Sequence, residues 1–342
     1  MRLVFSGSWF DKDGLWEARI RRLHKFESLE DLEHVDFGFL LISYGFSSQT
    51  LGIKVKASEY PRLVFLELDE PSPFVKHEDS LNLRLLSSSF DEKNYTEAVK
   101  KVKEFIAEGT IYQLNLTCKF DFEMSGKPID LFLRYYKSQP VPYAFFLDLE
   151  DFYLVCGSME LFLEKRGKKV VSKPIKGTAQ SREELLKSQK DRAENLMITD
   201  MVRNDLSRVA LRCSVKVEEL FSVEEFRTLF QMHSTVSAQT EENVKNILMA
   251  TFPPASVVGA PKRKAVELID LLEPHPRDYY CGCAGFVFGG DFTLCVLIRT
   301  AIGSGNKLSY YAGAGIVWDS LPEKEWREVL LKTKAFCETL MA

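Results

Sequence analysis

The chain has 342 residues, of which 45% are hydrophobic and 27% charged, and its formal net charge is −4. It carries no basic stripe of the kind that binds nucleic acid, and no apolar run reaches the roughly 18–20 residues that span a bilayer. The N-terminus also lacks the apolar core of a signal peptide, so we expect a cytoplasmic protein without nucleic-acid or membrane partners.

The first half of the chain predicts strands around one clear helix. Residues 1–90 have the short apolar and aromatic runs of strands separated by turns, most clearly at Val35–Tyr44 and Leu63–Leu68. The pattern over Glu92–Ala107 predicts a helix that stops near Gly109, followed by a strand over Ile111–Phe120. Residues 141–173 alternate well enough for two or three more strands.

The second half predicts helices and strands in blocks. The sequence Ser181–Glu184 is a capping box, which predicts the start of a long helical region that continues toward Arg208. Further helices are expected at Thr240–Thr251, Pro261–Leu272 and Pro322–Leu340, and further strands at Tyr279–Phe288, Leu294–Ile302 and Leu308–Ile316. Within the first of these strands, alternation would place Cys281 and Cys283 on one face. Blocks of strands followed by blocks of helices favour an α+β fold.

Two predicted helices carry paired carboxylates. Asp191 and Glu194 are three residues apart in one, and Glu325 and Glu328 have the same spacing in the other. Residues at this spacing share a helix face, so facing pairs would suit a hard cation such as Mg²⁺. Spacing alone favours the simpler interpretation of a solvated helical face.

Lys176 stands immediately before a glycine at the end of a predicted buried strand. Glycine at position 177 would let backbone amides approach a ligand closely. A lysine amine that is held neutral in such a place can act as a nucleophile, although most lysines are simply surface charges.

Several segments, taken together and in order, resemble the chorismate-utilising enzyme family. They are Gly109–Leu116, Pro174–Thr178, Asp191–Met197, Arg203–Asp205, Gly259–Lys262, Ile298–Thr300, Ala312–Ile316 and Asp319–Glu323. The resemblance implies antiparallel β-sheets packed together with helices on the outside. Residues 1–90 would form a shortened N-terminal part and residues 91–342 the chorismate-binding catalytic region, merged into one domain.

Two positions divide the family by reaction. Members that aminate chorismate at C4 typically have Pro-Ile-Lys-Gly-Thr, as here at Lys176, whereas anthranilate synthases have alanine in place of the lysine. Isochorismate and salicylate synthases usually have a lysine base where this chain has Gln113. The resemblance therefore implies amination of chorismate to 4-amino-4-deoxychorismate, on the route to p-aminobenzoate and folate, with ammonia from a separate glutaminase subunit. Anthranilate synthesis with pyruvate release, isochorismate synthesis and a catalytically silent scaffold remain as alternatives.

The resemblance also implies roles for individual residues. Lys176 would be the covalent nucleophile and Glu160 the general acid, while Glu194 and Glu328, with Asp191 and Glu325 beside them, would hold Mg²⁺. The expected substrate-binding residues are Gln113, Gly177, Thr178, His233, Tyr280, Arg299, Gly313, Ala314, Gly315 and Lys332. Structural alternatives to these roles stay open. The glycines near 313 would then shape a tight turn, His233 would be packed or hydrogen-bonded without a role in the site, and Lys262 would face either the site or the solvent.

Overall fold

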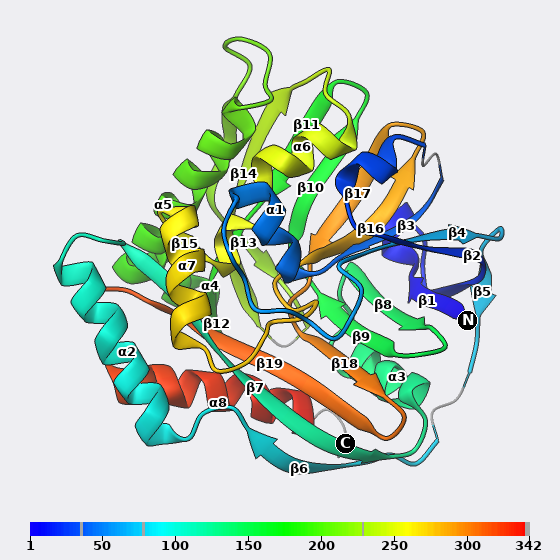
Figure 1. Cartoon of the computed structure of the whole chain (residues 1–342), viewed down its shortest axis with the longest axis horizontal. Coiled ribbons are helices and arrows are strands. Elements are labelled where there is room, and N and C mark those ends of the chain that lie inside the picture. The colour runs from blue at the N-terminus through cyan, green and yellow to red at the C-terminus, as the bar shows by residue number, and fades with distance from the viewer. Residues whose placement is uncertain (35–36, 77–78, 228, 339–342) are drawn as a thin grey trace.

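A computed structural model describes the chain except for residues 35–36, 77–78, 228 and 339–342. Its two antiparallel sheets share one long strand, β2 (Leu15–Phe26), as Figure 1 shows. The first residues of β2 pair with β1 (Arg2–Ser6) and the last with β4 (Leu63–Leu68). The N-terminal segment is thus built into both sheets.

The first sheet runs from β2 and β1 to a pair of long strands, β7 and β19. Its strands in spatial order are β5 (Ser72–Phe74), β2, β1, β8 (Tyr143–Asp148), β9 (Tyr153–Ser158), β18 (Thr300–Ser304), β19 (Lys307–Ile316), β7 (Gln113–Ser125) and β6 (Asn82–Ser88), with the short β15 (Gly259–Ala260) also on β7. Beyond Tyr310, the edge of β19 that faces away from β7 pairs with no other strand of the described chain.

The second sheet runs from β2 to the strand that carries Lys176. Its order is β2, β4, β3 (Phe37–Ile42), β16 (Cys283–Phe288), β17 (Asp291–Val296), β10 (Leu161–Arg166), β11 (Lys169–Lys173), β14 (Phe230–Gln239) and β13 (Lys216–Glu225), with β12 (Ile175–Ala179) following β11 along β14.

Aromatic side chains fill the space between the two sheets. Phe145 of β8 meets Phe39 of β3 with ring centroids 5.1 Å apart, and Phe5 of β1 meets Phe286 of β16 at 5.0 Å. These rings are buried and meet edge to face, an arrangement that adds about 1 kcal/mol per pair beyond simple burial.

The helices cover the outer faces and the sheet ends. They are α1 (Ser47–Leu51), α2 (Glu92–Ala107), α3 (Pro128–Ser138), α4 (Arg182–Lys187), α5 (Gln189–Ser207), α6 (Val244–Thr251), α7 (Lys262–Leu272) and α8 (Pro322–Glu338). Helix α8 packs on β19 and α2, whereas α5 packs on β12 and β14. No helix in the described chain is both long and apolar enough to cross a membrane.

Several predicted elements agree with the structure. The strand Leu63–Leu68 and the helix Glu92–Ala107 have the expected bounds. Ser181 caps α4 by accepting a hydrogen bond from the Glu184 amide. The α+β class is confirmed.

Other predictions of elements were wrong. Residues 141–173 form four strands, because the chain turns after each of β8, β9 and β10. The predicted strand Leu294–Ile302 is split after Val296, since Arg299 adopts a left-handed backbone (φ 52°) that ends strand geometry. Cys281 (φ 67°) likewise lies before the strand that holds Cys283, so the two do not alternate along one strand.

The helical regions also differ from prediction. The region that starts near Ser181 is two helices, because Ser188 ends α4 and its hydroxyl caps α5 at the Asp191 amide. The helix expected from Thr240 starts at Val244, where Asn243 provides the cap. Residues 339–340 of the expected last helix lie outside the described residues. Helix α3 and the hairpin β13–β14 were not predicted.

Candidate functional site

The site begins where the glycines of β19 lie beside the polar face of β7. Gln113, Asn115 and Thr117 alternate with apolar residues along β7, so they share one face of the strand. A Cβ atom at Gly313 would lie 2.8 Å from Thr117 Cγ2 and 3.3 Å from Asn115 Nδ2. The glycines belong to a strand, so their interpretation as a tight turn was wrong; they leave room for neighbouring side chains.

Three functional groups converge above Gly315. A Cβ atom there would lie 2.8 Å from Gln113 Nε2, 3.2 Å from Glu194 Oε2 and 3.5 Å from Lys176 Nζ. Gln113 Nε2 also donates a hydrogen bond to Glu194 Oε2 (3.3 Å). The structure therefore brings together β7, β12, α5 and β19 at one point.

Glu160 lies in the turn between β9 and β10, close enough to Lys176 for the charge of that lysine to act on it. The Ile175 amide donates to its Oε1 at 3.3 Å, which ties the carboxyl to the residue before Lys176. Burial raises the pKa of Glu160 to about 7, although hydrogen bonds from Ser256 and Ile175 and the charge of Lys176 oppose the rise. A carboxyl with this pKa keeps its proton in much of the protein near neutral pH and can donate it.

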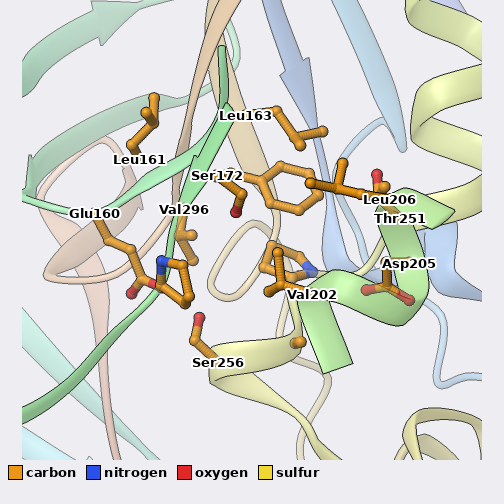
Figure 2. A pocket seen from close by; sticks show the side chains of 14 residues that line it. Glu160, Leu161, Leu163, Ser172, Val202, Asp205, Leu206, Thr251, Ser256 and Val296 are labelled. Atoms are coloured by element: carbon orange, nitrogen blue, oxygen red, sulfur yellow. The ribbon is translucent and has the colours of Figure 1, made fainter. Parts of the chain in front are cut away.

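A small cavity of about 10 Å³ adjoins Glu160, enough for about one water molecule. Figure 2 shows Glu160 and Asp205 on opposite sides of it, with Ser256 near Glu160. Asp205 is paired with Lys262, whose Nζ donates to Asp205 Oδ2 (2.5 Å) and to the Thr251 carbonyl (2.6 Å). Lys262 is thus a buried ion-pair partner that joins α5, α6 and α7.

The paired carboxylates of α5 and α8 lie close enough for their charges to interact. Burial raises the pKa of Glu194, with Lys176 and Lys190 opposing it and Asp191 and Glu328 adding to it. The pKa of Glu328 is lowered, because the charge and hydrogen bond of Lys332 outweigh its burial. Lys332 Nζ lies 2.7 Å from Glu328 Oε1 and 2.8 Å from the Gly313 carbonyl, so it ties α8 to β19.

The carboxylates were tested as a site for Mg²⁺. Within the described residues, no three His, Cys, Asp or Glu side chains come together closely enough to hold a metal by themselves. Mg²⁺ needs fewer protein ligands, since it is usually held by one or two carboxylates together with substrate and water. Glu325 Oε2 is buried without a hydrogen-bond partner, and Glu328 lies close enough for its charge to act on Glu194. This donor set fits Mg²⁺.

Arg299 forms a second, positively charged region of the candidate site. Its guanidinium lies among Tyr310, Tyr135 and Tyr280, and hydrogen-bonds to the Tyr310 oxygen. The groups that act most strongly on its pKa are thus tyrosine hydroxyls and not carboxylates. Tyr280 is buried and stacks on Tyr311, with ring centroids 5.3 Å apart.

Two of the predicted substrate-binding residues, Thr178 and His233, make their contacts away from the side chains of Lys176 and Glu160. Thr178 is exposed on β12 and pairs with Gln231 in the sheet. His233 pairs with Ile175 in β14, and its Nε2 is 3.7 Å from Glu219 Oε2. Burial lowers the pKa of His233, and the charges that act on it come from Glu224, Lys173 and Glu219. Neither contact set includes Lys176 or Glu160.

The remaining predicted residues lie on the same elements as the converging groups. The Cβ of Asp191 lies 3.0 Å from where a Cβ at Gly177 (φ 94°) would be, so glycine there lets β12 approach α5. Ala314 is buried between the two glycines of β19. The sequence analysis missed Ser256, Tyr310 and Lys190; only Lys190 had a visible signal, its position four residues before Glu194.

A comparison with models of known protein families shows to which family the chain belongs. Residues 31–338 match the family model of the chorismate binding enzyme. The chain belongs to this family.

The relatives of this chorismate-binding enzyme include two kinds of synthase. It is 31% identical to aminodeoxychorismate synthase component 1 of Bacillus subtilis, over 94% of this chain and 74% of the relative, and 36% identical to the protein of the same name from Escherichia coli, over 82% and 64%. It is 34% identical to anthranilate synthase component 1 of Aquifex aeolicus, over 74% and 54%. The chain therefore spans less than two thirds of the last two relatives.

Solved structures show the same fold. Anthranilate synthase component I from Streptococcus pneumoniae TIGR4 has a TM-score of 0.80 at 22% identity, covering 98% of this chain and 92% of that one. MenF, the menaquinone-specific isochorismate synthase from Escherichia coli, has a TM-score of 0.80 at 20% identity, covering 100% and 88%.

The substitution Gly315→Ala should push the ends of the Gln113 and Glu194 side chains away from their positions beside Lys176. The side-chain ends can move aside, so we expect a stability cost of only about 1 kcal/mol, but a displacement near 1 Å should lower kcat/KM for chorismate by about 100-fold. Urea unfolding and steady-state kinetics measure the two effects. The control is Gly45→Ala, where a Cβ would meet only Ser43 Oγ at 3.5 Å; equal activity of both variants would contradict the steric account.

The substitution Glu160→Gln should stabilise the protein at high pH. Because the folded-state pKa is raised, Glu160 favours folding only below the unfolded-state value, and that contribution is lost as pH rises from 4.5 through about 7. At about 1.4 kcal/mol per pH unit, the free energy of unfolding of the Gln variant should exceed that of the parent by about 3 kcal/mol above pH 7 and by almost nothing below pH 4.5. Urea unfolding across this range checks it, with exposed Glu183→Gln as control; a gain independent of pH would contradict burial of the charge.

Proposed function

We propose that this chain aminates chorismate at C4 to give 4-amino-4-deoxychorismate, using ammonia from a separate glutaminase subunit. The observation that carries the proposal is the amine of Lys176 beside the non-basic Gln113, with the protonatable Glu160 tied to the preceding residue. Relatives named aminodeoxychorismate synthase component 1 support it.

Substrate binding follows from charge. Chorismate carries two carboxylates, an enolpyruvyl ether and an allylic hydroxyl at C4. Arg299 would bind the enolpyruvyl carboxylate, since a guanidinium offers a planar pair of donors. Tyr280 and those backbone amides of Gly313–Gly315 that face the unpaired edge of β19 would line the same region.

Magnesium would be held by Glu194 and Glu328, with Asp191 and Glu325 in its surroundings. When bound, it would neutralise these carboxylates and clamp the ring carboxylate of the substrate. Lys332 would keep Glu328 in place from the same helix face.

The first half-reaction is attack by the Lys176 amine at C2. As the N–C2 bond forms, the two ring double bonds shift and the C4–O bond breaks. Glu160 donates a proton to the departing C4 oxygen, so the group leaves as water, which is a far better leaving group than hydroxide. The covalent intermediate divides one difficult substitution into two easier ones.

The second half-reaction reverses the first with a different nucleophile. Ammonia adds at C4, the double bonds return and the N–C2 bond breaks, which releases Lys176. The Glu160 carboxylate takes back a proton from the new C4 ammonium, so the acid is restored. The enolpyruvyl group stays on the product.

Anthranilate synthesis is the second candidate, because relatives of 33–36% identity bear that name. Lys176 distinguishes the two proposals: anthranilate synthesis has no need of an amine at this position, which anthranilate synthases fill with alanine. An isochorismate synthase needs a base to activate water, and Gln113 cannot remove a proton.

The test of the function is the product that the purified chain makes from chorismate, Mg²⁺ and ammonium. We expect 4-amino-4-deoxychorismate, identified by chromatography and mass, with no pyruvate released. A fluorescent aromatic product with stoichiometric pyruvate would establish anthranilate synthesis instead. A product that forms equally well without ammonium would show isochorismate synthesis, and no turnover at saturating ammonium would support a scaffold.

Removing the amine should slow amination. We expect Lys176→Ala to fold normally but to lose at least about 100-fold in kcat at low ammonia, because only a half-buried nucleophile is removed. The matched control is Lys173→Ala, an exposed lysine three residues earlier, which should keep the parent rate. If Lys176→Ala also keeps that rate, covalent catalysis through this amine is wrong.

A further inference from the structure

Lys190 stands where a helix disfavours a cation. It is the second residue of α5, one turn before Glu194, and the Ser188 cap marks the start of that helix. The N-terminal end of a helix carries partial positive charge, which repels a lysine placed in the first turn. A residue that conflicts with its local setting in this way is compensated by something farther away in the chain.

The compensation comes from the carboxylates of the proposed metal site. Lys190 Nζ lies 3.5 Å from Glu325 Oε1 on α8 and 3.9 Å from Glu194 Oε1 on its own helix. It therefore connects α5 to α8 across the space that Glu194 and Glu328 face. The Glu325 and Glu194 side chains are only 4% and 11% exposed, so their negative charges need a partner there.

We propose that Lys190 is an internal counter-ion, which a divalent cation displaces when it binds between α5 and α8. The inference rests on the proposed magnesium site, because the ammonium and the metal would compete for the same carboxylate oxygens. Lys190 would hold the two helices together in the metal-free enzyme and would lower the affinity for the metal.

Lys190 and Lys332, which pair with carboxylates of α5 and α8, differ in how easily each can move away from its partner. The Lys190 side chain is 49% exposed, so its flexible stem can carry the ammonium into solvent when a metal arrives. Lys332 is fixed by the Gly313 carbonyl as well as by Glu328. Lys190 is accordingly the group whose removal should change metal binding.

The test is Lys190→Met, which keeps the length and packing of the stem but removes the charge. Titration calorimetry with Mg²⁺ alone should give a dissociation constant roughly three- to tenfold lower than in the parent, the size expected from losing a half-exposed ion pair. Scanning calorimetry in EDTA should give a lower melting temperature than the parent, and saturating Mg²⁺ should reduce that deficit.

Two controls separate the local effect from the loss of any positive charge. Lys187→Met removes an exposed lysine at the end of α4, three residues before Lys190, where it pairs with Glu183, and should leave the Mg²⁺ affinity unchanged. Lys190→Arg keeps the cation and should bind Mg²⁺ no more tightly than the parent.

Each outcome of the titration is decisive for Lys190. Unchanged or weaker Mg²⁺ binding by Lys190→Met would overturn the proposal while leaving the amination of chorismate untouched. Absence of binding in both proteins would remove the magnesium site as well, and the product assay above would still judge the function separately.

Discussion

The site depends on a single close approach, in which side chains from three separate elements meet above Gly315. A Cβ at this position would overlap Gln113 Nε2 and crowd Glu194 Oε2, and it would touch Lys176 Nζ at van der Waals distance. The approach is possible because β19 is held against β7 along its whole length, while its other edge is unpaired beyond Tyr310. The two sheets and the helices on them therefore serve to bring an amine and several carboxylates within reach of one small molecule.

The second constraint is the balance of charge. Glu194, Glu325 and Glu328 lie near Lys190, and Lys176 acts on Glu160 and Glu194; burial strengthens the interactions of the enclosed Glu160, Glu194 and Glu325 most. These carboxylates have different environments: the raised pKa of Glu160 keeps it partly protonated near neutral pH, Lys332 lowers the pKa of Glu328, and Glu194 lies beside the position proposed for the metal. These differences allow side chains of one chemical type to act as acid, as positioned anion and as ligand.

The elements with strong local patterns could be predicted from sequence. Glu92–Ala107 has a clear apolar face and a stop signal at Gly109, and Leu63–Leu68 is a continuous apolar run. The failures occurred where tertiary contacts override local preference: Arg299 breaks a strand through its left-handed backbone, and the glycines of β19 provide space in a strand instead of a turn. The converging side chains were named through family resemblance, whereas the pairing of Lys190 with α8 depends on a contact 135 residues away.

The central claim is that the Lys176 amine bonds covalently to the ring. The most direct measurement is mass spectrometry of the enzyme after acid quench during turnover with chorismate and Mg²⁺ at limiting ammonia, followed by peptide mapping. The account predicts a mass increase equal to chorismate minus water, located at Lys176 and removed by a chase with ammonium. An unmodified peptide around residue 176 throughout turnover to 4-amino-4-deoxychorismate would contradict it.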